Sequence, residues 1–536
     1  MVVFLGLSSC EDEILDKETR SEFNEEVAWE SPEMVQVYLN SLYSEFEMDA
    51  GMLYECLGDD YETTKNSKIW TINKDLVNSS NFDAGWSFRE LRKANQVITR
   101  LSGESKIEMN EAERANLLGQ AHFFRAWTLF QKAKVFGGLI LLEKVMKPDD
   151  DFDLPRATEE DTWTYIIKEF RKSADYLKGQ NVENYRVSYG AALAMLMRAQ
   201  LYAGSYDGVK ETYAEIEKVG YDLHETYGPI WKTPSAWKSS PEVILAYEYR
   251  KKEKVNPWTR VNCPQSSISD LNGGGGAGVT HQHTEVYLVK DEDGVWRKWE
   301  DSKHKANTKP ADGVLEHLYG NRELRFYENV MTDKTTCMGY DFAFNEGGKS
   351  GSLTNFEEEE IWDHVSQVKT GYMCKKFMGE DPDYLPTRKY ECDLPSIALR
   401  YAEVILNYAE ACLMTGEEAN ARAAINRTRK RAGLPELDAS ADLREEYKDE
   451  RHKELAFEGH RYFDLLRWAK QEKRDMIPEL NRRSKWILID KERKAYKIIE
   501  AKYDKYYRKW SKRRFLMPIP FGQLEYNPNL VQNPGW

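Results

Sequence analysis

The sequence predicts a mainly α-helical protein, in which a tetratricopeptide-like helical frame carries a large loop-rich insertion with short strands. Three observations lead to this prediction. Apolar residues recur at helical spacing through much of residues 11–220 and 396–536. Residues 199–204 and 411–416 share one helix, tight turn, helix pattern although they lie far apart in the chain. Between them, glycine, asparagine and aromatic residues punctuate short apolar stretches, which is typical of loops and brief strands.

Helix signals follow one another in the first region, residues 11–220. Ser31 followed by Pro32 predicts an N-cap and a first helical position. Gly137 is expected to end a long helix, and Thr158 has capping-box spacing for the start of the next one. Further helices are expected at residues 83–101, 112–136, 187–203 and 207–219.

The two repeated turns favour one frame over the three or four domains that chain length alone would suggest. Small alanines at the helix contact and a glycine at the turn suit the closely packed helix pairs of tetratricopeptide repeats. Because the insertion interrupts the repeats, sequence-distant pieces are expected to close a single frame. The expected divisions are a truncated lipoprotein signal with its lipidation cysteine (1–10), an N-terminal helical region (11–220), the insertion on the ligand-binding side (221–395), and C-terminal helices with a wrapping tail (396–536).

Within the insertion, brief strands are predicted at residues 243–247, 286–289 and 372–377. A GxGxxG pattern at 273–278 has no apolar strand before it and no good helix start after it, so a dinucleotide site lacks its context. His281 and His283 could bind a metal ion, but no third ligand is evident. Neither a metal nor a cofactor is therefore expected.

Composition excludes several classes of protein. The chain has 76 basic and 90 acidic residues, and its formal charge of -14 disfavours nucleic-acid binding. No run of eighteen apolar residues occurs, so any membrane attachment is expected to be covalent. No pair of carboxylates stands out for glycoside cleavage, and no GxSxG or HExxH motif appears. We therefore expect a protein without enzyme activity.

Cys10 is the expected point of attachment. It ends the sequence Leu-Ser-Ser-Cys, the order that lipoprotein processing enzymes read before they acylate the thiol. Residues 1–6 contain no Lys or Arg, so the true translation start is expected further upstream. The alternative is an accidental cysteine in a short N-terminus. The other six cysteines allow several pairings, and Cys412 is expected to be a small buried side chain.

Residues 450–468, ERHKELAFEGHRYFDLLRW, predict about five turns of one helix. Acids and bases would lie within i,i+3 or i,i+4 reach of each other along one stripe. Gly459 inside a helix costs about 1 kcal/mol relative to alanine, which suggests that another backbone crosses closely there. The residues expected to build this structural, non-catalytic motif are Glu450, Arg451, Glu454, Glu458, Gly459, Arg461, Asp464 and Arg467.

Aromatic residues suggest the ligand class, because 15 Trp and 31 Tyr offer many flat surfaces for the C–H faces of sugars. Those in weakly periodic segments are candidate platforms, although each could instead pack its loop against the frame. Trp86 precedes a helix, and Asp60 could bind hydroxyl groups nearby. The candidate glycan-binding residues are Trp70, Trp86, Trp258, Tyr287, Trp296, Trp299, Tyr340 and Asp60.

Residues 450–468 and the ending PIPFGQLEYNPNLVQNPGW resemble the signature of the SusD/RagB family of outer-membrane nutrient-binding lipoproteins from Bacteroidetes. The resemblance covers nearly the whole chain. Other matching pieces are LRKANQVI (91–98), AALAMLMRAQLYAG (191–204), SPEVILAYEY (240–249) and LRYAEVILNYAEA (399–411).

The resemblance implies a lipid-anchored protein on the cell-surface face of the outer membrane. It would bind an oligosaccharide and deliver it to a SusC-like TonB-dependent outer-membrane transporter without breaking bonds. In such a family the charged motif is structural, and ligand-contacting residues do not transfer by motif. The alternatives are a peptide-binding RagB-type lipoprotein, a tetratricopeptide adaptor, and a surface glycosidase.

Overall fold

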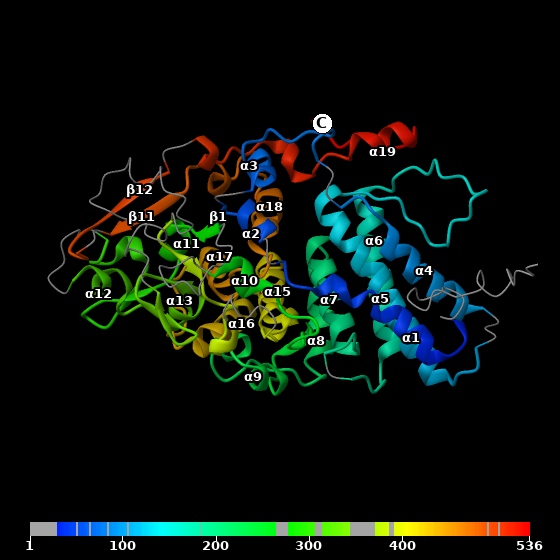
Figure 1. Cartoon of the computed structure of the whole chain (residues 1–536), viewed down its shortest axis with the longest axis horizontal. Helices are drawn as coiled ribbons and strands as arrows, with labels where there is room; N and C mark the ends of the chain where they lie inside the picture. Colours follow the sequence, from blue (N-terminus) through cyan, green and yellow to red (C-terminus); the bar gives the residue numbers. More distant parts are fainter. Residues whose placement is uncertain are drawn as a thin grey trace, which may run out of the picture.

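The computed structural model describes residues 29–49, 52–63, 66–82, 85–103, 107–183, 185–263, 277–305, 313–342, 370–384, 391–489, 492–501 and 504–536. Cys10 and residues 273–276 of the GxGxxG pattern lie outside these ranges. The molecule is elongated, with helices α1, α4, α5 and α6 at one end and the β11–β12 hairpin at the other (Figure 1).

Capping residues start and stop the N-terminal helices as their sequence predicts. The Ser31 hydroxyl accepts the Met34 N–H at 3.4 Å, and Pro32 opens α1. The Thr158 hydroxyl accepts the Asp161 N–H at 3.0 Å at the start of α6. The helices of this region are α1 (Pro32–Asn40), α2 (Leu53–Leu57), α3 (Ser67–Asn73), α4 (Arg89–Ser102), α5 (Glu111–Phe136), α6 (Glu159–Leu177), α7 (Tyr189–Tyr202) and α8 (Tyr206–Ile216).

The helical frame runs through two distant parts of the chain. Helices α4 to α8 pack in sequence order, and α8 then packs on α15 (Tyr401–Met414). From there α15 contacts α16 (Glu418–Arg431), which contacts α17 (Leu443–Glu454). The turns after α7 and α15 match, with Gly204 at φ 74° and Gly416 at φ 78°, a conformation that favours glycine. This arrangement confirms a mainly helical, tetratricopeptide-like frame interrupted by an insertion.

Short antiparallel ladders organise the insertion and its borders. Strand β2 (Val243–Tyr247) pairs with β10 (Ser396–Arg400), so the start of the insertion meets the strand that leads into α15. The other pairs are β1 (Tyr61–Thr63) with β3 (Ala277–Val279), β4 (Val289–Lys290) with β5 (Trp296–Arg297), β6 (Val330–Met331) with β9 (Met373–Cys374), β7 (Thr335–Cys337) with β8 (Tyr340–Phe342), and β11 (Lys485–Ile489) with β12 (Tyr496–Glu500).

The remaining helices are short. They are α9 (Pro234–Lys238), α10 (Trp258–Asn262), α11 (His281–Glu285), α12 (Val314–Tyr319), α13 (Leu324–Asn329), α18 (Arg461–Gln471) and α19 (Phe521–Tyr526). Turns of 3₁₀ helix lie at Tyr43–Phe46, Pro229–Trp231, Trp299–Asp301, Pro382–Tyr384, Pro478–Leu480, Asp504–Tyr506 and Lys512–Phe515.

Two local predictions were wrong, and one hairpin was not predicted. Residues 286–288 form no strand, and β4 begins only at Val289. A helix does start at His281, because the Thr280 hydroxyl caps α11 by accepting the His283 N–H at 3.2 Å. The β11–β12 hairpin was not predicted in the basic, aromatic stretch that contains it. In each case fewer than six residues carry the signal, which is too short for periodicity to separate helix from strand.

The C-terminal tail packs against the frame. The Arg156 guanidinium donates to the Phe136 carbonyl at 2.7 Å and to Asn533 Oδ1 at 3.1 Å. The Trp536 indole N–H donates to the Leu516 carbonyl at 2.9 Å. These bonds hold the last residues beside the end of α5.

The sequence predicts that no helix crosses a membrane and that Cys412 is buried. None of the helices in the described residues combines the length and the apolar character needed to cross a bilayer. The six cysteines among these residues are buried and form no disulfide, and Cys412 is a fully buried thiol.

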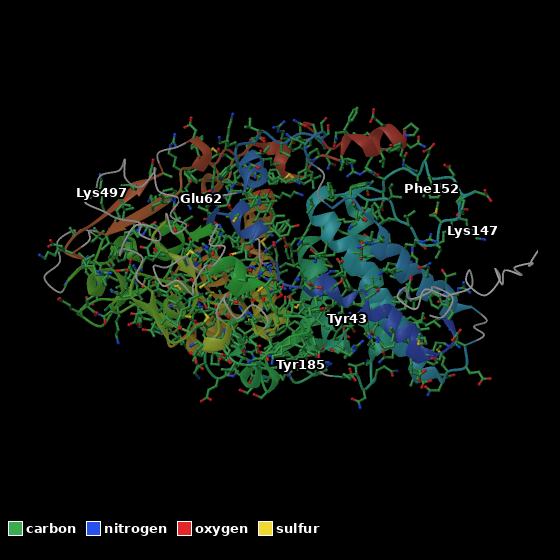
Figure 2. The ribbon with its side chains drawn as sticks, in the orientation of Figure 1. Tyr43, Glu62, Lys147, Phe152, Tyr185 and Lys497 are labelled. Carbon is green, nitrogen blue, oxygen red and sulfur yellow. The ribbon has the colours of Figure 1, made fainter. Side chains whose placement is uncertain are left out.

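Figure 2 shows the spread of side chains, with Glu62 of β1 near the middle of the molecule, Lys497 of β12 at one end and Phe152 toward the other.

Candidate functional site

Residues 450–468 form two helices instead of one. Helix α17 ends at Glu454 and α18 begins at Arg461, and in the turn between them Phe457 and Gly459 have φ of 64° and 77°. The prediction that Gly459 lies inside a helix was therefore wrong. A Cβ there would meet only a Glu55 carboxylate oxygen, at 3.9 Å, so the glycine serves the left-handed backbone and not a close crossing.

The acids of this motif pair mostly with bases from other segments. Glu450 accepts from Arg325 Nη1 at 2.6 Å, and Glu454 accepts from Arg400 Nη1 at 2.7 Å. Asp464 and Arg467, 2.8 Å apart, are the i,i+3 pair that the helical stripe predicts. All of these side chains are buried. The motif thus ties the insertion and β10 to α17 in one interior network.

The network keeps its carboxylates ionised. Burial alone would favour the neutral acid, but Arg431, Arg400 and Arg325 together hold the pKa of Glu454 well below its usual range. Arg325 likewise lowers the pKa of buried Glu450. Unpaired charges at such depth would be strongly destabilising, so each cation is needed for the fold.

The turn after α17 also docks on α2. The Gly459 N–H donates to the Glu55 carboxylate, and burial raises the pKa of this acid to about 7. Arg461 binds Asp59 with both ends of its fork, through Nε to Oδ1 at 2.8 Å and Nη2 to Oδ2 at 3.0 Å. This contact places the next two residues of α18 beside α2, where the Phe463 ring lies 4.7 Å from the Tyr54 ring.

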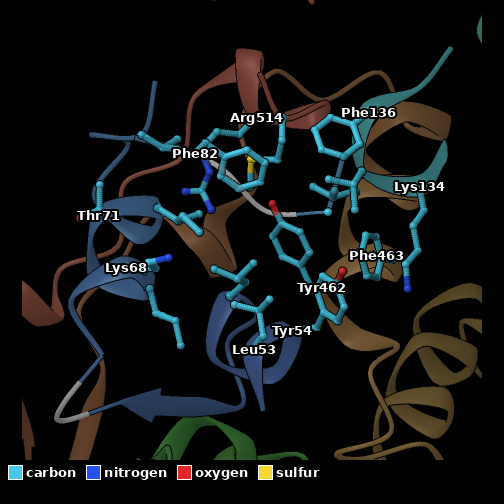
Figure 3. A pocket seen from close by; sticks show the side chains of 18 of the residues that line it. Leu53, Tyr54, Lys68, Thr71, Phe82, Lys134, Phe136, Tyr462, Phe463 and Arg514 are labelled. Atoms are coloured by element: carbon cyan, nitrogen blue, oxygen red, sulfur yellow. The ribbon is translucent and has the colours of Figure 1, made fainter. Parts of the chain in front are cut away.

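A cavity of about 550 Å³ opens between α2, α3, the end of α5, α18 and the tail (Figure 3). Its walls are mainly apolar, and polar side chains stand among them. The aromatic lining residues are Tyr54, Phe82, Phe136, Tyr462, Phe463 and Phe515. The polar ones include Asn66, Lys68, Thr71, Asn81, Gln131, Lys132, Lys134 and Arg514. We call this cavity the α2–α18 pocket.

Two polar groups in this pocket are buried without a hydrogen-bond partner: the Tyr462 hydroxyl, and Nε and Nη2 of Arg514. Figure 3 shows both side chains pointing into the pocket. Burial raises the pKa of Tyr462, and the charge and close contact of the nearby Arg514 oppose that rise. Because a buried donor without an acceptor is unfavourable, this pair is suited to a ligand that brings hydroxyl groups.

Lys134 stands at another wall of the pocket. Its ammonium lies 4.4 Å from the centre of the Phe463 ring and 4.7 Å from that of the Tyr54 ring. Burial lowers its pKa to about 7. In its protonated form, the side chain is held over two aromatic faces by cation–π attraction.

Four of the aromatic residues proposed from sequence are buried. Trp258 and Trp299 are each 1 % exposed, Tyr287 is fully buried, and Trp86 is 9 % exposed. Trp258 packs edge-on against Phe377 at 4.8 Å, and the Arg322 guanidinium covers Trp299 at 4.2 Å. The expectation of exposed platforms is not met at these positions, because the loops that carry them fold their rings into the core.

The other proposed residues lie apart from the pocket lining. Asp60 is fully buried and bonded to two histidines. Trp70 is partly exposed on α3 and donates its indole N–H to the Thr63 carbonyl at 3.0 Å. Trp296 and Tyr340 are also partly exposed and stay predictions as ligand contacts. None of the eight lines the α2–α18 pocket.

Sequence reasoning missed the residues that do line this pocket. Tyr462 and Phe463 lie within residues 450–468, but they were not named as candidate ligand contacts. Arg514 and Phe515 precede the tail prolines, where no periodic signal marks a site. A recognisable cue was the aromatic pair directly after Arg461.

Two family models match this chain. The family model described as the SusD family matches residues 241–536, more than half of the chain. The chain belongs to the SusD family. A second model, described as "Starch-binding associating with outer membrane", matches residues 13–201.

Relatives agree with this membership. A SusD-like protein from Bacteroides ovatus is 21% identical over 489 residues, which cover 87% of this chain and 80% of the relative. The crystal structure of a SusD-like protein from Bacteroides fragilis aligns with a TM-score of 0.80 and 29% identity, over 95% of this chain and 98% of that one.

A further similar structure is surface glycan-binding protein A from Bacteroides thetaiotaomicron in complex with laminarihexaose. It aligns with a TM-score of 0.65 and 17% identity over 94% of this chain and 99% of that one, a level that shows the shared fold alone. Together the family matches support glycan binding and association with the outer membrane for this SusD-family chain.

Proposed function

We propose that this protein is a lipoprotein on the cell-surface face of the outer membrane, which binds an oligosaccharide in the α2–α18 pocket. It then passes the sugar to a SusC-like TonB-dependent transporter. The observation that carries the binding step is an aromatic-lined cavity with the Tyr462 hydroxyl and two guanidinium nitrogens of Arg514, Nε and Nη2, as polar groups that a ligand can bond. Sugar rings offer C–H faces to the aromatic walls and hydroxyl groups to Tyr462 and Arg514.

The chemistry of the pocket supports binding without cleavage. Among the described residues that line it there is no aspartate, glutamate or histidine. Glycoside hydrolysis needs two carboxylates placed on either side of the scissile bond. The bound sugar would therefore meet donors and aromatic faces, and no pair of carboxylates to cleave it.

Replacing Arg514 with methionine is expected to weaken oligosaccharide binding about tenfold or more, since a hydrogen bond to a charged group contributes about 1.5–3 kcal/mol. Tyr462→Phe, which removes only a hydroxyl, should have a smaller effect in the same direction. Isothermal calorimetry against a panel of neutral oligosaccharides measures both, with circular dichroism to confirm folding.

Arg100→Met is the matched control, because Arg100 is exposed at the end of α4, and its guanidinium lies over the Trp29 ring, far from the pocket lining. If both pocket variants fold and bind the oligosaccharide with unchanged affinity, the sugar binds outside this pocket. Release of reducing ends from the panel would contradict the non-catalytic proposal. Selective binding of peptides would favour the alternative of a peptide-binding lipoprotein.

Labelling cells with a palmitate analogue tests the proposed anchor at Cys10. We expect the full-length protein to incorporate the label and Cys10→Ala to lose it, because two or three acyl chains on one cysteine are what hold such a protein on a bilayer. Protease digestion of intact cells should then remove the labelled protein from the surface. A full-length protein that takes up no label would contradict the lipoprotein proposal.

The delivery step is tested by purification from detergent-solubilised outer membranes. The tagged protein should bring down a TonB-dependent barrel in near-equal amount, since a stable complex buries a large interface. Recovery of the protein without any barrel would remove the transporter from the proposal.

A further inference from the structure

Three side chains from distant parts of the chain meet in the interior of the molecule. Asp60 precedes β1, His283 lies in α11 of the insertion, and His452 lies in α17. His283 Nδ1 is 3.1 Å from Asp60 Oδ1 and 3.3 Å from His452 Nε2, and His452 Nε2 also contacts Asp60 Oδ1. All three are buried, with exposed fractions of 0 %, 1 % and 6 % for Asp60, His283 and His452.

Hydrogen bonds do not satisfy every polar atom of this cluster. Both imidazole nitrogens crowd onto one carboxylate oxygen, while Asp60 Oδ2 is buried and has no hydrogen-bond partner. A buried carboxylate oxygen without a donor is unfavourable. Two imidazole nitrogens and a carboxylate converging on one point form instead the donor set that zinc and similar ions prefer.

Two of the three spacings in the cluster, both made by His283 Nδ1, and the contacts behind that ring fit such an ion. Tetrahedral bonds of about 2.0–2.1 Å hold ligand atoms about 3.3–3.4 Å apart, close to the spacings that His283 Nδ1 makes in the cluster. The second nitrogen of His283 lies 2.9 Å from the Tyr287 hydroxyl, to which Asn329 Nδ2 donates at 2.9 Å. These contacts fix the orientation of the imidazole ring, as outer partners commonly do for metal-binding histidines.

We propose that Asp60, His283 and His452 bind one divalent transition-metal ion of the Zn²⁺ class. The ion would clamp the N-terminal segment, the insertion and α17 together. Because α2 lies directly before Asp60 and supplies Leu53 and Tyr54 to the pocket, the clamp would also hold one wall of the α2–α18 pocket in place. Its role is structural, and it does not depend on which ligand the pocket binds.

Metal analysis of the untagged, full-length protein tests this directly. Inductively coupled plasma mass spectrometry should find about one equivalent of zinc or a similar ion per chain after dialysis. Removing it with a chelator should lower Tm, and Zn²⁺ but not Mg²⁺ should restore it, since an ion that binds only the folded state stabilises that state. A metal-free protein whose Tm does not respond to Zn²⁺ would overturn the proposal.

Single substitutions test which residues bind the ion. His452→Gln and Asp60→Asn should each lose the metal and the Zn²⁺-dependent rise in Tm. The control is His122→Gln, which removes another buried histidine. Its Nδ1 lies 2.6 Å from Glu169, a carboxylate that also pairs with Arg125 and Lys172. The control variant should keep the metal. Full metal content in both cluster variants would place the ion elsewhere, and if neither folds, the wild-type measurement decides alone.

Discussion

Replacing Arg400 with methionine is expected to lower the free energy of unfolding by about 3–5 kcal/mol. Its guanidinium is 1 % exposed and donates to three carboxylates: to Glu242 at 2.8 Å, to Glu454 at 2.7 Å and to Glu458 at 2.7 Å. Methionine fills similar space but leaves these acids short of one cation in a region that water does not reach. The size of the effect comes from that uncompensated charge.

Urea unfolding followed by tryptophan fluorescence measures this change. Arg89→Met is the matched control, since the guanidinium that it removes is 80% exposed and pairs at 2.9 Å with the partly buried Glu90. An exposed pair contributes about 0–1 kcal/mol, so the control should be close to neutral. Equal, small effects for both variants would show that the buried network does not hold the insertion to the frame.

Gly138→Ala is expected to destabilise the protein by about 3 kcal/mol, at the upper end of the range for overpacked sites. A Cβ at this position would lie 2.1 Å from the Ala157 carbonyl oxygen and 3.2 Å from the Thr158 carbonyl carbon. Both are backbone atoms at the start of α6, so no side-chain rotation relieves the clash. The segment after α5 would have to move, and Phe136 of the pocket wall with it.

The unfolding temperature of Gly138→Ala is compared with that of the control variant Gly103→Ala. At Gly103 a Cβ meets nothing within 4 Å and φ is -97°, so alanine is compatible with the backbone and should be neutral or slightly stabilising. If Gly138→Ala unfolded at the wild-type temperature, the close approach of these two segments would be contradicted.

Much of the helical frame could be predicted because local signals act there. Ser31, Thr158 and Gly137 are capping or terminating residues whose effect depends on their immediate neighbours. The matching turns at Gly204 and Gly416 likewise predicted that distant helices join one frame. The break in residues 450–468 escaped prediction because Phe457, a residue that rarely adopts positive φ, starts the left-handed turn.

The candidate site was less accessible to sequence reasoning, since burial depends on contacts between distant segments. Trp258 and Trp299 occur in weakly periodic stretches, yet Phe377 and Arg322 cover their rings. The pocket instead draws on segments far apart in the chain, from Leu53 to Met517. A third ligand for His283 could not be seen either, because His452 and Asp60 approach it only in the folded chain.

A crystal structure with a bound oligosaccharide tests most directly whether this SusD-family protein binds sugar in the α2–α18 pocket. The sugar should lie against the pocket's aromatic walls, with hydroxyl groups within hydrogen-bond distance of the Tyr462 oxygen and of Arg514 Nε or Nη2. Sugar density found at Trp296 or Tyr340, with the α2–α18 pocket holding only water, would contradict the proposed site.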